Sequence, residues 1–161
     1  MDKRLYELLN QQIKSELYSA YLYLSMASYC DSVNLEGFSK WMKVQAKEEV
    51  GHAMKIYEFL NDRNERVILE GIEKPPSDFS SPVDIFSKTL EHEKKVTAMI
   101  EKIFEAAKDA GDSASIVFLQ WFINEQVEEE KQAGRVLEKL KMIEKSPAGL
   151  LFIDNELGKR E

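Results

Sequence analysis

Residues that end helices are scarce in this chain, and that scarcity limits what it can fold into. The 161 residues include seven glycines and four prolines, which gather at a few places. Elsewhere, apolar residues recur at steps of three and four, the spacing of one face of an α-helix. The pattern therefore predicts an all-α protein with four long helices, over about 2–30, 34–62, 82–110 and 113–144.

Three helix starts carry recognisable capping signals. Asn34 is placed to cap the second helix. Ser81-Pro82 opens the third helix, with serine as the cap and proline at the first helical position. Ser146-Pro147 repeats this signal and predicts a short C-terminal fifth helix over about 147–158.

The lengths of the connections predict the topology. The first two helices are joined by a few residues, as are the third and fourth, so each pair should be antiparallel. The stretch 64–81 is long enough to travel the length of a helix. We therefore expect one domain, 1–161, with a four-helix bundle over about 2–144 and one long crossover; an up-and-down bundle with a long loop is the alternative.

The bulk composition excludes several functions. A net charge of -7 argues against nucleic acid as a partner, and 43% hydrophobic residues suit one sizeable core. The single cysteine, Cys30, cannot form an internal disulfide or a four-thiolate metal site. No apolar run has membrane-spanning length, and the amino terminus lacks the apolar run of a signal peptide, so a cytoplasmic protein is expected.

Each long helix carries polar residues in the middle of its otherwise apolar core-facing line. Because these interruptions all fall near mid-helix, they should meet at one level of the bundle. A single glutamate of this kind is usually a solvated surface residue, and a single Glu-x-x-His is common by chance; four coincident interruptions are not. The interruptions are Gln12 and Glu16, then Gln45, Glu49 and His52, then Glu93, and finally Gln126 and Glu129.

Several carboxylates in one dry core would repel each other, and each unpaired buried charge costs several kcal/mol. Either the acids are protonated or a cation compensates them. No lysine or arginine lies on the four lines, so bound dications are the simplest compensation. Glu49 and His52 are three residues apart and can reach one metal. A donor set of oxygens with one imidazole suits iron or manganese better than structural zinc.

At this point the sequence resembles the bacterial non-haem ferritins over nearly its whole length. The resemblance rests on Glu16 with Tyr23, on Glu49-x-x-His52, on His92-Glu93, and on the run FLQWFINEQVEEE at 118–130. It implies an iron-storage protein that is also a ferroxidase: ferrous iron is oxidised by O2 or H2O2 at a di-iron centre. It further implies that ferric oxo-hydroxide is stored as a mineral inside a hollow shell of 24 identical chains, with no membrane or nucleic-acid partner.

The resemblance also implies residue roles. Glu16, Glu49 and His52 would hold a first iron, and Glu49 would bridge to a second. The second iron would be held by Glu93 and Glu129, with Gln126 close by. Tyr23 would be either an electron donor or a core tyrosine, and His92 a neighbour of the ligands rather than a ligand. A third iron site would use Glu48, Glu125 and Glu128.

Departures from the patterns of related families argue against two other kinds of ferritin-like protein. The fourth helix carries Gln126-x-x-Glu129 in place of a second Glu-x-x-His, which disfavours the symmetric centres of bacterioferritin and of the rubrerythrin group. Bacterioferritin places a haem-ligating methionine after the bridging glutamate; here that residue is Val50, so no haem is expected. The nearby Met54 is expected to serve packing. Rubrerythrins also add a four-cysteine domain, which one cysteine cannot supply.

Two further segments carry expectations about assembly. The apolar run 150–153 cannot be buried by one bundle end; it is either a docked tail or, as in ferritins, part of a fourfold contact. Counting along the fourth helix puts the lining of a threefold channel near Ile116 and Leu119, with Asp112 as the nearby acid. The alternatives to a ferroxidase are a purely structural helical assembly and a di-iron oxygenase with an organic substrate.

Overall fold

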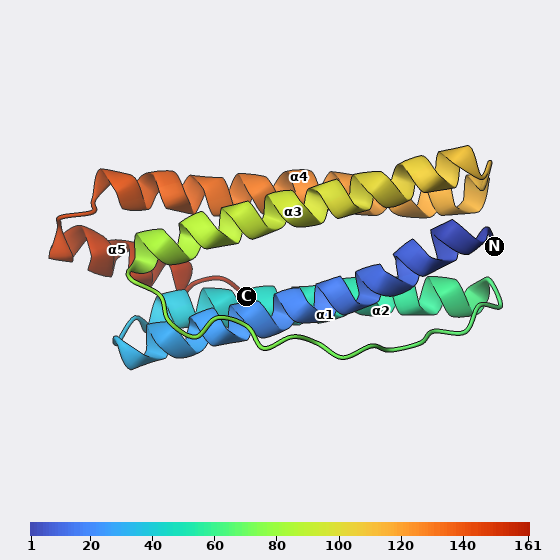
Figure 1. The fold of residues 1–161 in the computed structure, drawn as a ribbon. Coiled ribbons are helices and arrows are strands. Elements are labelled where there is room, and N and C mark those ends of the chain that lie inside the picture. Colours follow the sequence, from blue (N-terminus) through green and yellow to red (C-terminus); the bar gives the residue numbers. More distant parts are fainter.

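The computed structural model describes residues 1–161 as five helices (Figure 1). The all-α prediction is confirmed, and most predicted boundaries fall within two residues of the observed ones. The fourth helix ends at Met142, two residues earlier than predicted. The helices are α1 (Lys3–Ser32), α2 (Glu36–Asp62), α3 (Pro82–Asp109), α4 (Ser113–Met142) and α5 (Pro147–Leu157).

The four long helices form two antiparallel pairs, α1 with α2 and α3 with α4, as Figure 1 shows. The crossover between α2 and α3 runs along the length of α1, which confirms the predicted topology. Side chains of α1 hold it there: Tyr6 donates to the Arg66 carbonyl at 2.7 Å, and the Asn10 amide exchanges two hydrogen bonds with Ile68. No helix carries an apolar stretch that could cross a membrane.

Side chains cap four of the five helices. Ser81 and Ser146 cap α3 and α5 as predicted, and Asp112 caps α4 by accepting from the Ser115 amide. The prediction for Asn34 is wrong: the residue before α2 is Leu35, and no side chain caps this helix. Asn34 instead has φ 63°, the left-handed conformation that asparagine tolerates and that the tight reversal after α1 requires.

The core consists of two apolar clusters at opposite ends of the bundle. One contains 18 buried residues around Phe38, Met42 and Phe86, and the other contains 13 around Leu9, Ile56 and Ile100. The buried polar residues of the four core lines belong to neither cluster. The sequence thus divides its core into two apolar halves with a polar layer between them.

Candidate metal centre

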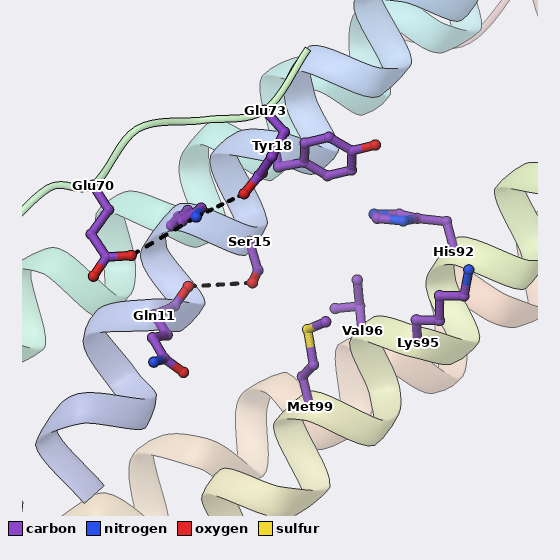
Figure 2. Close-up of a pocket in the computed structure, with 10 residues that line it drawn as sticks. Gln11, Ser15, Tyr18, Glu70, Glu73, His92, Lys95, Val96 and Met99 are labelled. Atoms are coloured by element: carbon purple, nitrogen blue, oxygen red, sulfur yellow. Dashed lines mark hydrogen bonds and ion pairs between the residues drawn. The ribbon is translucent and has the colours of Figure 1, made fainter. Parts of the chain in front are cut away.

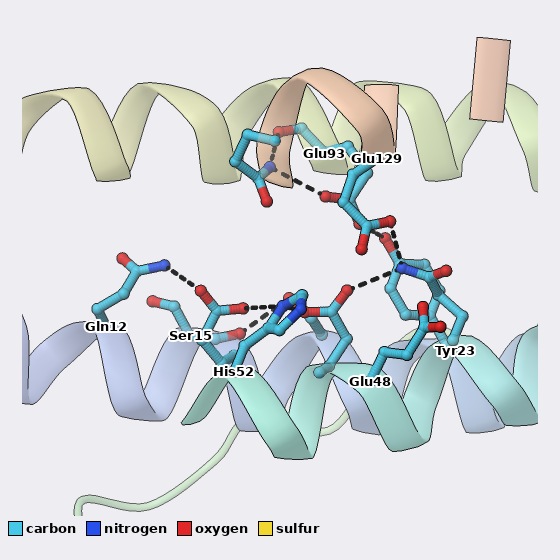
Figure 3. Close-up of polar contacts among 12 residues, drawn as sticks. Gln12, Ser15, Tyr23, Glu48, His52, Glu93 and Glu129 are labelled. Carbon is cyan, nitrogen blue, oxygen red and sulfur yellow. Dashed lines mark hydrogen bonds and ion pairs between the residues drawn. The ribbon is translucent and has the colours of Figure 1, made fainter. Parts of the chain in front are cut away.

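All four long helices contribute to the buried polar layer, which lies at one level of the bundle (Figure 3). The acids and the histidine predicted to meet in the core are each at most 5% exposed. Their positions follow from the helical period, because each replaces an apolar residue on a core-facing line. We call four of them the inner acids: Glu16, Glu49, Glu93 and Glu129.

The first potential metal-binding group joins α1 to α2. One ligand atom from each of Glu16, Glu49 and His52 lies within 4.8 Å of the others. His52 Nδ1 is 3.2 Å from Glu49 Oε2 and 3.8 Å from Glu16 Oε2. Glu16 Oε1 accepts from the Gln12 amide at 2.9 Å, but Glu16 Oε2 is buried without any hydrogen-bond partner. The nearest cationic group is His52 at 3.8 Å, beyond hydrogen-bond distance, so this oxygen is free to bind a metal ion.

The second group joins α2 to α3 and α4. Glu49, Glu93 and Glu129 place one oxygen each within 4.8 Å of one another. Glu49 therefore belongs to both groups, which is the position of a bridging carboxylate. The Tyr23 hydroxyl donates to Glu93 Oε1, and Gln126 Nε2 donates to Glu93 Oε2 at 3.1 Å. Tyr23 and Gln126 thus orient one ligand from opposite helices.

Gln45 is a residue of the centre to which the sequence analysis assigned no role. Its amide nitrogen donates to Glu49 Oε1 at 3.0 Å and to Glu129 Oε2 at 2.7 Å, linking α2 to α4. Its own carbonyl oxygen is buried without a partner. The signal was present: Gln45 precedes Glu49 by four residues on the same line, as Gln12 precedes Glu16.

Burial sets the protonation of the second group. It raises the pKa of Glu93 to about 7 and that of Glu129 to about 8, and it raises the pKa of Glu49 well above its ordinary value. Neighbouring carboxylates add to these shifts through repulsion. Tyr23 is likewise raised well above its ordinary pKa by burial and by the charge of Glu93. The centre therefore holds protons at neutral pH that a metal ion would displace.

His52 is the internal counter-ion of the first group. Burial alone would lower the pKa of His52, but its contacts with Glu16 and Glu49 raise it to about 11. Burial likewise opposes ionisation of Glu16, yet His52 and the Gln12 amide bring its pKa below the ordinary value. The expectation that the inner acids lack a cationic partner was based on lysine and arginine alone and does not hold for Glu16 and Glu49.

The three residues predicted for a third site, which we call the outer acids, lie at the edge of the polar layer. Glu125 joins His52 and Glu129 in a third group whose ligand atoms are within 4.8 Å. Glu48 and Glu128 join no such group. Glu48 pairs with Arg160 at 2.5 Å, and Glu128 pairs with Lys131 at 3.1 Å. The structure thus brings one outer acid to the inner ones and gives the other two cationic partners.

His92 lies beside the centre and joins none of the metal-binding groups. His92 Nε2 shares a 2.7 Å hydrogen bond with Ser19 Oγ, and the Ser19 hydroxyl also lies 3.0 Å from the Ser15 carbonyl. Burial lowers the pKa of His92 to about 4, which keeps the ring neutral. The ring centroid lies 5.9 Å from that of Tyr18, and both residues line a hollow between α1, α3 and the crossover (Figure 2) whose volume is about 460 Å³.

Two residues lie elsewhere than expected, and a third already has a charged partner. Met54 is 45% exposed, so it does not pack within the bundle. Leu119 is fully buried in the core and cannot line a channel at the surface of the chain. Asp112 forms a two-pronged ion pair with Arg63, with both oxygens at 3.0 Å, besides capping α4. The prediction is wrong for Leu119 because it ignored which face of α4 that residue occupies; Ile116 is half-buried.

Comparison with known proteins identifies the family. The ferritin-like domain family matches residues 6–143, and the chain belongs to the ferritins. A bacterial non-heme ferritin of Staphylococcus aureus is 38% identical over 160 residues, covering 99% of this chain and 96% of the relative. A probable bacterial non-heme ferritin-like protein of Haemophilus influenzae is 35% identical over 158 residues, covering 98% and 96%.

Solved structures agree with this assignment. The open pore ferritin from the hyperthermophilic archaeon Archaeoglobus fulgidus superimposes with a TM-score of 0.99 at 48% identity, covering 100% of this chain and 98% of that one. A closed form of the same ferritin, engineered by site-directed mutagenesis, gives 0.98 at 49% identity, covering 100% and 98%. The resemblance inferred from the motifs is confirmed.

Proposed function

We propose that two ferrous ions bind as substrates in the two groups that share Glu49. Glu16, Glu49 and His52 hold the first ion. Glu49, Glu93 and Glu129 hold the second, and Gln126 steadies Glu93. The observation that carries this assignment is the sharing of Glu49, because one carboxylate within reach of two ligand sets can bridge two ions. The partnerless Glu16 oxygen supports it independently.

The chain is an iron-storage ferritin with ferroxidase activity. Each ferrous ion gives one electron to O2 or H2O2, and the ferric products hydrolyse to the oxo-hydroxide of the mineral. The inner acids favour oxidation because their negative charge stabilises ferric more than ferrous iron. Tyr23 contacts Glu93 and is placed to supply an electron to the centre. The second group contains no histidine, which suits a site that passes ferric iron onward.

We further infer a third, weaker iron site at the outer acids, and a shell of 24 chains. The grouping of Glu125 with His52 and Glu129 supports the third site. Leu151 and Phe152 on α5, which are 63% and 66% exposed, support a contact between chains. Removing the residues after Ser146 should weaken the shell; a full-length protein that scatters light as a monomer at micromolar concentration would contradict it. A cytoplasmic location stays a prediction.

Different observations argue against the two alternatives, a structural assembly and a di-iron oxygenase. A structural assembly with inert acids does not explain a bridging carboxylate shared by two ligand groups. An oxygenase would need a roomy apolar pocket beside the metals. The 460 Å³ hollow next to His92 is lined mainly by polar and charged side chains, which does not match that need.

Anaerobic titration with ferrous iron, followed by exposure to air, tests the proposed function. Two ions per chain should bind before oxygen is admitted, and a coloured transient should then form in proportion to the bound pairs. Oxidation no faster than iron in buffer would overturn the assignment. Glu49→Gln is the variant to compare with the wild type in both steps. It preserves the shape of the bridging side chain and removes its charge, so any loss of binding or oxidation reports the charge alone.

A further inference from the structure

The residues after α5 return to α2 and bring a cation to the edge of the metal centre. Arg160 Nη2 donates to Glu48 Oε2 at 2.5 Å, and Nη1 donates to the Trp41 carbonyl at 3.4 Å. The guanidinium carbon lies 4.3 Å from the centre of the Trp41 ring. The Arg160 side chain is only 16% exposed, whereas the Glu48 side chain is 41% exposed, so the arginine is packed against the fold while the carboxylate stays open to solvent.

The docking of α5 fixes the position of Arg160. Asp154 Oδ1 accepts a hydrogen bond from the Phe38 amide at 3.0 Å, in the first turn of α2. The backbones meet so closely that a Cβ on Gly37 would lie 1.7 Å from the Asp154 carbonyl oxygen. This close contact at Gly37 anchors the end of α5, and only two residues lie between α5 and Arg160. The arginine is therefore held in place by the fold.

Glu48 is the member of the outer acids that this contact affects. Glu125 gathers with His52 and Glu129, whereas Glu48 joins no metal-binding group and is occupied by the guanidinium. We propose that Arg160 is the resident counter-ion of Glu48, and that a third ferrous ion gains this ligand only by displacing it. Arg160 is thus a positioning residue that sets the affinity of the third site. The inference rests on the proposed function.

Competition for one carboxylate explains this role. Arginine binds carboxylates through directed, charge-assisted hydrogen bonds, and the contacts of Arg160 with the Trp41 ring and carbonyl keep Nη2 aimed at Glu48. A dication that takes the same oxygen must break those contacts and approach a positive charge. By reciprocity, an ion bound there loosens the tail, so the third site and the docking of α5 are coupled.

Calorimetric titration of the assembled, iron-free protein with Zn²⁺ tests the proposal without any oxidation. The wild type should bind two ions tightly and a third weakly. In Arg160→Gln the third ion should bind about tenfold more tightly, with the first two unchanged. Lys159→Gln is the matched control: it removes the same charge from the neighbouring position, where Lys159 pairs only with Glu156. The control should bind the third ion as the wild type does.

A second pair of variants separates the proposed role from a merely structural one. In a Glu48→Gln background, Arg160→Gln should no longer change the affinity of the third ion. Equal third-ion affinity in wild type and Arg160→Gln would overturn the inference, as would an effect that persists without Glu48. Failure of the wild type to bind the first two ions tightly would instead overturn the proposed function, and the inference with it.

Discussion

The inner and the outer acids are neighbours in sequence but differ in what surrounds them. Glu49 is buried at 2% exposure and shares its histidine with Glu16, whereas the side chain of adjacent Glu48 is 41% exposed and has an arginine of its own. One step along a helix turns a side chain by about 100°. That rotation separates Glu49, which shares one buried histidine with Glu16, from Glu48, which has its own arginine at the surface of the bundle.

The largest loss of oxidation rate should follow from substituting the ligands of the first group. We expect Glu49→Ala and His52→Ala each to slow rapid ferrous oxidation by more than about 100-fold, because even residues that only support a metal ligand cost 10- to 100-fold when lost. Stopped-flow absorbance with two ferrous ions per chain measures this. Wild-type rates in either variant would remove the residue from the centre.

The same two variants should differ in stability. His52→Ala takes away the cation between Glu16 and Glu49, and breaking a buried pair in this way costs about 3–5 kcal/mol. Glu49→Ala takes away a crowded acid and should cost far less. Thermal unfolding of the iron-free shells compares them, with size measurements to show that both still assemble.

The stability of the iron-free protein should depend on pH, and this dependence should also come from the inner acids. Glu93 and Glu129 have pKa values of about 7 and 8, against an ordinary value of 4.5, so the folded state retains protons that the unfolded chain has lost. Their stabilising contribution is therefore lost as the pH rises to about 8. His52, with a pKa of about 11, keeps its contribution over this range. We expect the melting temperature to fall by more than about 10 °C between pH 5 and pH 8.

Glu129→Gln is the control for this pH effect, since an amide cannot titrate. The fall in melting temperature should be smaller in Glu129→Gln. It should persist in Glu128→Gln, because Glu128 is exposed and paired with Lys131. Bound Zn²⁺ should reverse the trend, because the metal binds the deprotonated acids and competes better as the pH rises. A flat profile in the wild type would mean that the inner acids are ionised throughout.

Substitution of the outer acids should have a smaller effect on iron oxidation. Changing Glu48, Glu125 and Glu128 together to glutamine should leave the fast first oxidation in place and alter the iron-to-oxygen ratio or the later turnover. The reason is that only Glu125 approaches the inner ligands. Oxygen consumption measured over successive iron additions checks this. Unchanged stoichiometry and turnover would show that the three acids are only a solvated face.

The sequence predicted the residues whose positions follow from the helical period. It did not predict contacts between segments that are far apart in the chain. Every inner acid was found because it interrupts an apolar line. The Glu48–Arg160 contact was missed, because 112 residues separate the partners and nothing local marks them. Gln45 was on a predicted line, but only the packing of α2 against α4 shows that it joins Glu49 to Glu129.

The smallest effect should be at Asp112, the acid once expected near a channel. Asp112 caps α4 and holds Arg63 with both oxygens, so its charge is already paired. Asp112→Asn keeps a good capping residue and loses a half-buried ion pair; exposed pairs of this kind are worth about 0–1 kcal/mol. We expect an initial oxidation rate within about twofold of wild type and a melting temperature lowered by about 1–3 °C. Stopped-flow and thermal unfolding on one preparation measure both. A large loss of rate with the shell intact would mean that iron passes this residue despite its pairing, and that the inner and outer acids are not the only ones that handle iron.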